Sequence, residues 1–586
     1  MNIINLDAMK FLIDNKNCTQ KEISEGINYS IGAINKAVLE LKEKEIINNE
    51  NNLTDKGIEI VNKNKTRNAI ILAAGFGIRM VPINLNRPKG LLEVNGERLI
   101  ERLINQLHDA NIKNITVVAG FQKEKYEYLI DKFGVNLKII DTYHEKNNLH
   151  SLYAVRDEIS NTYILPSDLY FINSPFSEYE FYSWYMISDV KGRGSYIKEN
   201  RNREIINIGP DQISNKMIGV SYITEKDSKK AINILEEYAS TERYNNYFWE
   251  DALIRAGFKF YSKMINNDSY FEINTYESLR EFDNKSRHLK SSVINLIAEI
   301  FRVNKNEIKN IVTLKKGMTN RSFSFTIGEA KFIMRIPGEG TDKMINRKQE
   351  AKVYNLIKNK NICDDIIYIN PDTGFKITKF IDNSRECDIN SDEDIRKCMQ
   401  FVKKMHKQKL KIDHKFDPFN RIEYYESLWT QENSLYSDYS ETKKNIYKLK
   451  DFVEENKSEE ILCHIDTVQA NFLIYTDKNS EEEKVRLIDW EYAGMQDYRF
   501  DIANFCIYSL LDKEDSDKVI DLYYDYKTKD IDRYMIYAYM AISGLVWSNW
   551  CEIKSQLGVE FGEYSIKQYR YAKDYYRLLK DKGLVK

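Results

Sequence analysis

The spacing of apolar residues predicts a helical segment at the start of the chain, up to about residue 65. In IGAINKAVLELKEK, Ile31, Ile34 and Val38 recur every three or four residues and fall on one helical face. TQKEISEGI has the pattern of a capping box, a Thr followed three residues later by a Glu. EIINNENNLTDKG is then typical of strand, turn and strand. We therefore predict three helices and a hairpin.

The pattern changes after residue 66, where strand-like and helical stretches alternate. NAIILAAG, NITVVAG and TYILPSDLYF are strand-like, and IERLINQLHDANI has helical spacing. This alternation favours a parallel sheet covered by helices on both faces. From about residue 290, a helix (SSVINLIAEIFRV) and a β-rich stretch precede a long helical, aromatic-rich region. That order predicts a small β-lobe followed by a larger α-lobe.

Length and composition narrow the class of protein. A chain of 586 residues exceeds the about 250 to 300 that one core supports, so we expect domains at 1–65, 66–289 and 290–586. The net charge of −2 carries no electrostatic signature of nucleic-acid binding. Seven cysteines without a CxxC pair fit neither a disulfide framework nor a zinc site, and they favour a cytoplasmic location.

Neither a secretory signal nor a membrane span is expected from the hydrophobicity of the chain. The start lacks a basic stretch followed by an apolar one. The longest apolar run, at 535–547, is shorter than the roughly 20 residues of a spanning helix. The oligomeric state is not readable from the sequence.

The order of elements at 1–65 resembles a winged helix-turn-helix domain, whose second helix would enter the major groove of DNA. The polar face of that helix carries a mixed set of charges: Asn35, Lys36, Glu40 and Lys42. Such a face would steer weakly onto phosphates. An interaction or packing module is therefore favoured over DNA binding.

The loop AAGFGIRM has the residues of a phosphate site. Gly75 and Gly77 let a ligand approach the backbone closely, and backbone amides there can cradle phosphates. Arg79 and Lys89 add two cations, which suits a triphosphate under attack at its α-phosphorus. The alternative is a tight turn with surface cations.

With RPKGLLEVNG, this loop resembles the sugar-phosphate and phosphocholine nucleotidyltransferase family over about residues 66–285. The resemblance implies that Ala73, Ala74 and the two glycines hold the nucleotide, here CTP. It also implies that Arg79 contacts its phosphates and that Lys89 stabilises the transferring group. An aromatic pocket for a trimethylammonium group is predicted at Tyr247, Phe248 and Trp249 in NNYFWEDAL, with Glu250 or Asp251 as counter-charge.

Nucleotidyl transfer requires Mg²⁺ held by oxygen ligands at strand ends. Asp168 follows a strand-like run and would be presented at its carboxyl end; a turn or helix cap is the alternative. The family's second metal position corresponds to Asn274, where many relatives have Asp. Glu272 and Glu250 are nearby alternatives for that ligand.

CHIDTVQANFLIY and VRLIDWEYAG place three polar groups beside apolar runs. Asp466 lies five residues before Asn471, the spacing with which kinases put a catalytic base and a Mg²⁺ ligand on one loop. Asp489 follows across a predicted hairpin and would be the second Mg²⁺ ligand on ATP. Three unrelated turns, each satisfied locally, are the alternative.

The preceding β-rich stretch supports a kinase interpretation. KKGMTNRSF supplies a loop around Gly317 that could cover phosphates. Arg335 in FIMRIPG takes the place of the protein-kinase strand Lys, and Glu350 on the next helix could pair with it. Replacement of that Lys favours a small-molecule kinase.

HxDxxxxN, IDWEYAG, YRFDIANF and WSNWCEIKSQ resemble the choline and ethanolamine kinase family over about residues 295–580. A quaternary ammonium is best recognised by aromatic faces and a carboxylate. The residues predicted to bind it are Glu491, Tyr498, Trp547, Trp550 and Tyr569. For the aromatic ones, packing in the core is the alternative.

Together these resemblances predict a winged-helix α+β domain, a Rossmann-like nucleotidyltransferase domain and a bilobal protein-kinase-like domain. A kinase that makes phosphocholine from choline and ATP would supply a transferase that uses phosphocholine and CTP, with Mg²⁺ in both reactions. The predicted function is therefore a bifunctional choline kinase and phosphocholine cytidylyltransferase. The same reactions on ethanolamine or an aminoalkyl phosphonate, or a ligand-sensing DNA-binding regulator, are the alternatives.

Overall fold

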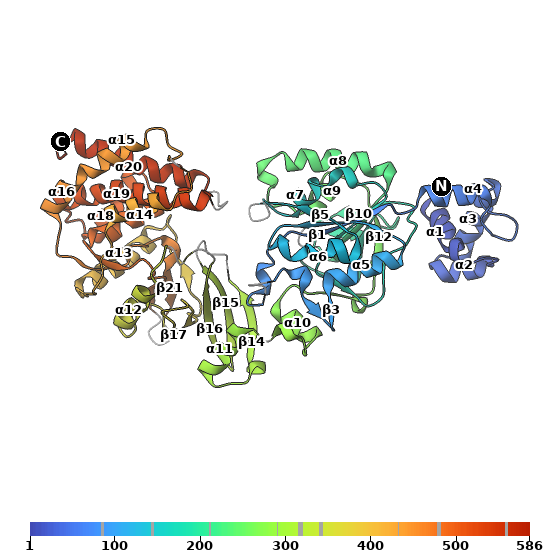
Figure 1. Cartoon of the computed structure of the whole chain (residues 1–586), viewed down its shortest axis with the longest axis horizontal. Coiled ribbons are helices and arrows are strands. Elements are labelled where there is room, and N and C mark those ends of the chain that lie inside the picture. Colours follow the sequence, from blue (N-terminus) through green and yellow to red (C-terminus); the bar gives the residue numbers. More distant parts are fainter. Residues whose placement is uncertain are drawn as a thin grey trace. The chain divides into compact units, whose positions relative to one another are not determined.

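The chain forms two compact units, Met1–Asn295 and Leu296–Lys586 (Figure 1). The computed structural model describes residues 1–83, 87–141, 146–209, 212–289, 291–314, 320–338, 341, 344–431, 433–476, 482–556 and 561–585, without the side chains of Ile78 and Arg287. Among the helices of these residues, none has both the length and the apolar character needed to cross a bilayer. The boundaries at 65 and 289 stay predictions.

The first 65 residues fold into four helices, one more than predicted. They are α1 (Ile3–Asp14), α2 (Gln20–Ile27), α3 (Ile31–Glu43) and α4 (Asp55–Lys63). The capping box is present: the Thr19 hydroxyl accepts from the Glu22 amide, and the Glu22 carboxylate accepts from the Thr19 amide. The hairpin is reduced to one bridge between Ile47 and Leu53. The sequence analysis missed helix α4 because this helix contains a glycine, Gly57. Packing requires the glycine, since a Cβ there would lie 2.3 Å from the Ile46 carbonyl oxygen.

The rest of the first unit is built on a seven-stranded sheet with the order β12-β8-β11-β6-β1-β4-β5. The bounds are β1 (Asn68–Ala73), β4 (Asn114–Ala119), β5 (Asn136–Ile139), β6 (Thr162–Pro166), β8 (Trp184–Gly192), β11 (Ser214–Ile223) and β12 (Tyr261–Ile265). Strand β1 pairs in parallel with β4 and β6, as predicted. Strand β11 is antiparallel to both of its neighbours, so the sheet is mixed.

Helices cover both faces of this sheet, as the alternation predicted. Ile71 belongs to one buried cluster with Ile104 of α5, and the adjacent Ile70 belongs to another with Leu235 of α8. The helices are α5 (Leu99–Asp109), α6 (Tyr128–Phe133), α7 (Asn148–Tyr153), α8 (Glu225–Ala239), α9 (Trp249–Arg255) and α10 (Tyr276–Phe282). Short strands outside the seven-stranded sheet form two-stranded pairs: β2 (Glu93–Val94) with β3 (Glu97–Arg98), β7 (Leu169–Phe171) with β13 (Tyr270–Glu272), and β9 (Ile197–Glu199) with β10 (Ile205–Asn207).

The second unit has a β-lobe and a larger helical lobe, as predicted. The first lobe has a five-stranded sheet, in the order β14-β15-β16-β18-β17, and two helices. Its elements are α11 (Ser292–Phe301), β14 (Ile308–Thr313), β15 (Asn320–Ile327), β16 (Ala330–Pro337), α12 (Arg347–Ile357), β17 (Ile366–Ile369) and β18 (Lys376–Lys379).

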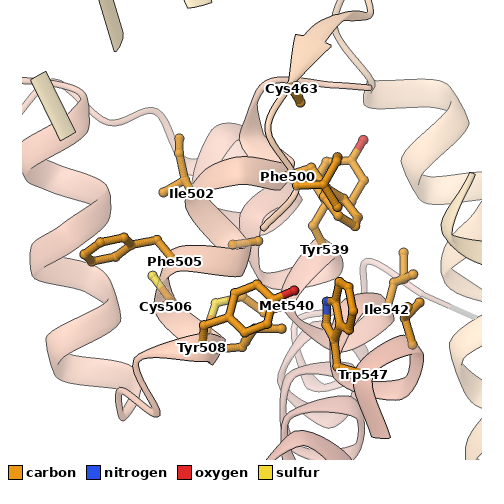
Figure 2. Close-up of a cluster of buried hydrophobic side chains, with 14 of the residues drawn as sticks. Cys463, Phe500, Ile502, Phe505, Cys506, Tyr508, Tyr539, Met540, Ile542 and Trp547 are labelled. Carbon is orange, nitrogen blue, oxygen red and sulfur yellow. The ribbon is translucent and has the colours of Figure 1, made fainter. Parts of the chain in front are cut away.

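The second lobe contains the remaining elements: β19 (Arg385–Glu386), α13 (Asp392–Lys407), α14 (Pro418–Ser427), α15 (Tyr439–Tyr447), α16 (Leu449–Asn456), β20 (Ile461–Cys463), β21 (Phe472–Thr476), β22 (Glu483–Leu487), β23 (Gly494–Gln496), α17 (Arg499–Tyr508), α18 (Lys513–Tyr523), α19 (Asp530–Gln556) and α20 (Glu563–Asp581). Residues 535–554, which include the apolar run, are buried in α19. Figure 2 shows Tyr539 and Met540 of this helix packed near Phe500 and Tyr508 of α17. Gly544 permits the close approach of α20, because a Cβ there would lie 2.6 Å from the Gln568 carbonyl oxygen.

Two candidate active sites

A cavity of about 470 Å³ opens where β1 and β6 end. This is the edge of an α/β sheet at which ligands bind, and the volume suits a small-molecule site. Of the residues that the sequence predicted for the transferase site, all but Tyr247 line it: Ala73, Ala74, Gly75, Gly77, Arg79, Lys89, Asp168, Phe248, Trp249 and Asn274. Gly77 has a φ of +64°, a conformation that glycine adopts without strain.

Lys89 lies at the centre of the polar contacts in this cavity. Its ammonium group forms an ion pair with the Asp168 carboxylate and donates a hydrogen bond to the Asn274 side-chain oxygen. Arg79 donates to the same oxygen at 3.4 Å. The other carboxylate oxygen of Asp168, Oδ1, is buried and has no hydrogen-bond partner in the described part of the chain. An unpaired carboxylate oxygen next to an amide oxygen fits a divalent cation.

The far end of the cavity is aromatic and acidic. Tyr196, Phe248 and Trp249 line it together with Glu250 and Asp251. Burial raises the pKa of Glu250 to about 8. A positive ligand placed here would favour the ionised carboxylate and would meet aromatic faces.

The sequence analysis missed several lining residues, among them Tyr196 and Lys146. Tyr196 precedes β9 and Lys146 precedes α7, in segments without a recognisable motif. Both side chains reach the cavity only because of the way the chain folds around it. Tyr247, which was predicted to belong to the aromatic pocket, does not line the cavity and instead packs against Tyr244, with ring centroids 4.8 Å apart.

In the second unit, the structure brings Asp466, Asn471 and Asp489 to one place. The Asn471 side chain donates to the Asp466 carboxylate at 3.2 Å, and the Ile488 amide donates to the Asn471 backbone oxygen at 3.0 Å. Burial and the charges of Asp489 and Glu491 raise the pKa of Asp466 to about 8. Because the Asn471 side-chain nitrogen donates to Asp466, the Asn471 side-chain oxygen is left for a metal ion.

The loops that carry these groups have strained backbone conformations, and hydrogen bonds to a buried carboxylate stabilise one of them. Ile465 and Asp489 have φ values of +72° and +65°, which are unfavourable for a β-branched residue and for an aspartate. Buried Asp501 accepts hydrogen bonds from the His464 and Ile465 amides at 3.0 and 2.8 Å. Asp501 lies in the YRFDIANF motif, so sequence could have identified it as a support of this loop.

The two terminal guanidinium nitrogens of Arg335 contact acidic side chains. It forms the predicted buried ion pair with Glu350 and lies 3.3 Å from an oxygen of Asp489. Glu491 is also part of this network, because its carboxylate accepts from Arg347 at 3.1 Å and from Asn320 at 2.9 Å. Glu491, which was predicted to bind the ammonium group, is thus paired with arginine. Gly317 lies outside the described residues.

Trp547 stands at the centre of a buried aromatic cluster. Its ring lies 5.4 Å from Tyr492, 5.3 Å from Tyr508 and 6.3 Å from Trp550, measured between centroids. Figure 2 shows Trp547 beside Tyr508. The indole nitrogens of both tryptophans and the hydroxyls of both tyrosines are buried, and none has a hydrogen-bond partner within the described ranges. These polar atoms and the ring faces beside them are available to a ligand.

Two aromatic residues predicted for this cluster lie with other partners, which corrects the predicted cage. Tyr498 stacks on Tyr523 at 6.0 Å, and its hydroxyl meets that of Tyr524 at 3.0 Å. Tyr569 stacks on Tyr436 at 3.8 Å and donates to Asp438 at 2.7 Å. Their positions, at the start of α17 and within α20, decide these partners. Tyr492 and Tyr508 were missed because they are far from Trp547 in sequence.

Comparison with known families agrees with this division of the chain. The model described as choline/ethanolamine kinase matches residues 311–544, and the MobA-like NTP transferase domain matches residues 69–181. The winged helix-turn-helix DNA-binding model matches residues 1–48. Each model therefore covers one of the segments distinguished above.

Individual relatives match one part of the chain each. The choline-phosphate cytidylyltransferase of Streptococcus pneumoniae is 28% identical over 37% of this chain and 96% of its own. The 2-aminoethylphosphonate cytidylyltransferase of Lancefieldella rimae is 33% identical over 33% of this chain and 80% of its own. The solved choline kinase LicA from Streptococcus pneumoniae is 24% identical with a TM-score of 0.43, over 50% of this chain and 99% of its own. The chain thus belongs to the cytidylyltransferase family through its middle segment and joins to it a domain of the choline/ethanolamine kinase family.

Proposed function

We propose that the chain phosphorylates choline with ATP and then transfers CMP from CTP to the phosphocholine, releasing CDP-choline and pyrophosphate. The observation that carries the choline assignment is the aromatic cluster of Trp547, Trp550, Tyr492 and Tyr508. Its buried, unpartnered polar atoms support a ligand site, and its ring faces suit a quaternary ammonium. A cytoplasmic location, where both nucleotides are available, is part of the proposal.

In the kinase reaction, the choline hydroxyl oxygen attacks the γ-phosphorus of ATP and ADP leaves. Asp466 would orient the hydroxyl and accept its proton, because positive ligands favour its ionised form. Asn471 and Asp489 would hold Mg²⁺, which neutralises phosphate charge when it is bound. Asp501 would keep the Asp466 loop in its strained, productive conformation.

In the transferase reaction, a phosphate oxygen of phosphocholine attacks the α-phosphorus of CTP and pyrophosphate leaves. Lys89 and Arg79 would stabilise the charge that develops there. Asp168 and Asn274 would hold Mg²⁺. The carboxylates of Glu250 and Asp251, with Tyr196 and Trp249, would receive the trimethylammonium group.

A second candidate is the same pair of reactions on a primary amine. The relative with 33% identity is named for 2-aminoethylphosphonate, which lacks methyl groups on its nitrogen. A primary ammonium would be better served by several hydrogen-bond acceptors than by ring faces. The tryptophan-rich cluster in the kinase domain therefore favours choline over ethanolamine.

The proposal is tested by incubating the protein with choline, ATP, CTP and Mg²⁺ and identifying the products by mass. Asp466→Ala should abolish phosphocholine formation but retain CDP-choline formation from supplied phosphocholine. Lys89→Ala should retain phosphocholine formation but lower kcat for CDP-choline formation by about 10²- to 10³-fold, as expected for the loss of one charge-stabilising group. Lys138→Ala, at an exposed position of β5, is the matched control and should change neither step. If either variant lost both reactions equally, the assignment of one reaction to each domain would be contradicted.

Substrate identity is tested by competition between choline and ethanolamine for ATP. Trp547→Leu should raise the choline KM by about 10-fold, as expected when a desolvated cation–π contact is lost. Its KM for ethanolamine and for ATP should change little. A wild-type enzyme that prefers ethanolamine would overturn the choline assignment.

A further inference from the structure

The buried carboxylate of Asp501 contacts a histidine as well as the loop that carries Asp466. Its Oδ1 accepts from the Ile465 amide at 2.8 Å, and its Oδ2 accepts from the His464 amide at 3.0 Å. The same Oδ2 lies 2.9 Å from Nε2 of His406, a residue of α13. The side chains of His406 and Asp501 are 4% and 0% exposed. Within the described ranges, no lysine or arginine forms an ion pair with Asp501, so His406 is its basic partner there.

The other ring nitrogen of His406 determines which tautomer the ring adopts. Nδ1 lies 2.9 Å from the hydroxyl oxygen of Tyr523, in α18. A carboxylate oxygen only accepts hydrogen bonds, so Nε2 must carry the hydrogen that meets Asp501. In the neutral ring, Nδ1 is then the acceptor for the Tyr523 hydroxyl. Hydrogen bonds therefore connect Tyr523, His406 and Asp501 without a gap to the loop that precedes Asp466.

The loop depends on this support because its backbone conformation is unfavourable. Ile465 has a φ of +72°, which a β-branched residue adopts only where surrounding contacts impose it, and Asp466 follows directly. The Asp501 carboxylate supplies these contacts only while it faces both amides. Without the donor from His406, the buried Oδ2 would lose one of its two hydrogen bonds. Such a loss is costly in a dry interior, so the carboxylate would no longer be fixed in this orientation.

We infer that His406 is a positioning residue of the kinase domain. Its Nε2 hydrogen orients the Asp501 carboxylate, and Asp501 in turn holds the loop that presents Asp466 to the substrate hydroxyl. This role rests on the proposed kinase function. Because His406 acts on the placement of Asp466 and touches neither substrate, its loss should slow phosphoryl transfer more than it weakens the binding of choline or ATP.

The test compares His406→Gln, His406→Asn and His406→Leu in the full-length chain. The amide nitrogen of glutamine can occupy the position of Nε2, whereas that of asparagine reaches only the position of Nδ1. His406→Gln should therefore keep kcat for phosphocholine formation within about fivefold of wild type, whereas His406→Asn and His406→Leu should lower it by about 10- to 100-fold. The KM values for choline and ATP should change by less than about threefold. Lys404→Leu, at an exposed position of the same helix, is the control and should change neither.

A role in packing alone predicts a different order of the variants. If His406 only filled space in the core, His406→Gln would be no better than His406→Asn, and the loss of kcat would follow the loss of thermal stability. That order, or a wild-type kcat in His406→Leu, would overturn the inference. Should His406→Leu fail to fold, the comparison of glutamine with asparagine still decides between the two roles.

Hydrogen exchange of the His464 and Ile465 amides separates this inference from the proposed substrate, because it requires no ligand. These amides exchange when their hydrogen bonds to Asp501 open. Mass spectrometry of the peptide that spans 461–468 should show exchange about 10-fold faster than wild type in His406→Asn, and less than about threefold faster in His406→Gln. Unchanged exchange in His406→Asn would refute the positioning role, even if choline is phosphorylated. Faster exchange in a protein that does not phosphorylate choline would refute only the proposed substrate.

Discussion

The side chains assigned to the two sites are buried or partly buried groups whose charge or hydrogen bonds are incomplete among the described residues. Asp168 has an unpartnered carboxylate oxygen, and the pKa values of Glu250 and Asp466 are raised to about 8 by burial. Trp547 has an unpartnered indole nitrogen. Groups held in this way act on charge in a ligand without first reorganising, which is the main source of electrostatic catalysis.

Glu250 makes a pH prediction for the transferase step. Its pKa of about 8 in the free site means that it is largely protonated at pH 7 and ionised at pH 9. Only the ionised carboxylate attracts a trimethylammonium group. The phosphocholine KM should therefore fall by about fivefold between pH 7 and pH 9, as expected for a charge interaction of about 1 kcal/mol.

Steady-state kinetics of Glu250→Gln provide the comparison. The amide cannot ionise, so the phosphocholine KM of this variant should be high and nearly independent of pH in the same range. The KM for CTP should be similar in both proteins. A wild-type phosphocholine KM that rises with pH would rule out this role for Glu250.

Helix α1 anchors the amino-terminal helices to the seven-stranded sheet. Buried Glu180, which precedes β8, accepts hydrogen bonds from Lys10 of α1 at 2.6 Å and Lys263 of β12 at 3.1 Å. The Tyr163 hydroxyl of β6 donates to it at 2.8 Å. Asp7 of α1 accepts from the Tyr182 hydroxyl at 2.7 Å.

These contacts favour a packing role for residues 1–65 over DNA binding. The segment contains nine lysines, no arginine and ten acidic residues, a net charge of −1. A DNA-binding module needs a positive surface to replace the counterions of the phosphates. The acidic balance and the ionic contacts of α1 therefore agree with the sequence expectation that this segment is an interaction module.

Lys10→Met should lower the free energy of unfolding of the first unit by about 1 to 3 kcal/mol at pH 7, because a buried carboxylate loses one partner. Burial favours protonated Glu180, but Lys263 and Lys10 outweigh it and lower its pKa to about 2. A lowered pKa stabilises the fold above the unfolded-state pKa of about 4.3. The difference between variant and wild type should then shrink as the pH falls from about 4 towards 2.

Chemical denaturation at several pH values measures this effect. Lys16→Met removes an exposed lysine of the same segment and should leave the stability within about 0.5 kcal/mol of wild type. Equal effects of Lys10→Met and Lys16→Met would show that the contact with Glu180 contributes no stability.

Each compact unit contains one of the two candidate sites, and this separation has a thermodynamic consequence. Each unit has its own hydrophobic core, so calorimetry of the intact protein should give two unfolding transitions. CTP with Mg²⁺ should raise the midpoint of one, and ATP with Mg²⁺ that of the other. At 100 times Kd, each ligand should stabilise its unit by about 2.7 kcal/mol, or roughly 5 to 10 °C.

Lys89→Ala should weaken the response to CTP alone, which assigns the first transition, and Asp489→Ala should weaken the response to ATP alone. A single transition that responds to both nucleotides would instead indicate that the two units unfold together.

Local patterns were sufficient for the elements and motifs that depend on neighbouring residues. The glycine loop with Gly77, the capping box at Thr19 and the paired Asp466 and Asn471 were all predictable. In each, the decisive contacts are made within a few positions of the chain, so backbone geometry and side-chain spacing are set locally. The two-lobed second unit followed for the same reason, since strand and helix periodicity are local properties.

Packing between distant segments determined the contacts that the sequence did not predict. Lys89 meets Asn274 across 185 positions, and Trp547 meets Tyr492 from another part of the lobe. Tyr498 and Tyr569 have the residue type of an ammonium cage, yet their positions at the start of α17 and within α20 direct them to other rings. Sequence determined which chemical groups are available and the local turns that present them. Tertiary structure alone decided which of these groups converge, because the burial that brings them together is a property of the assembled core.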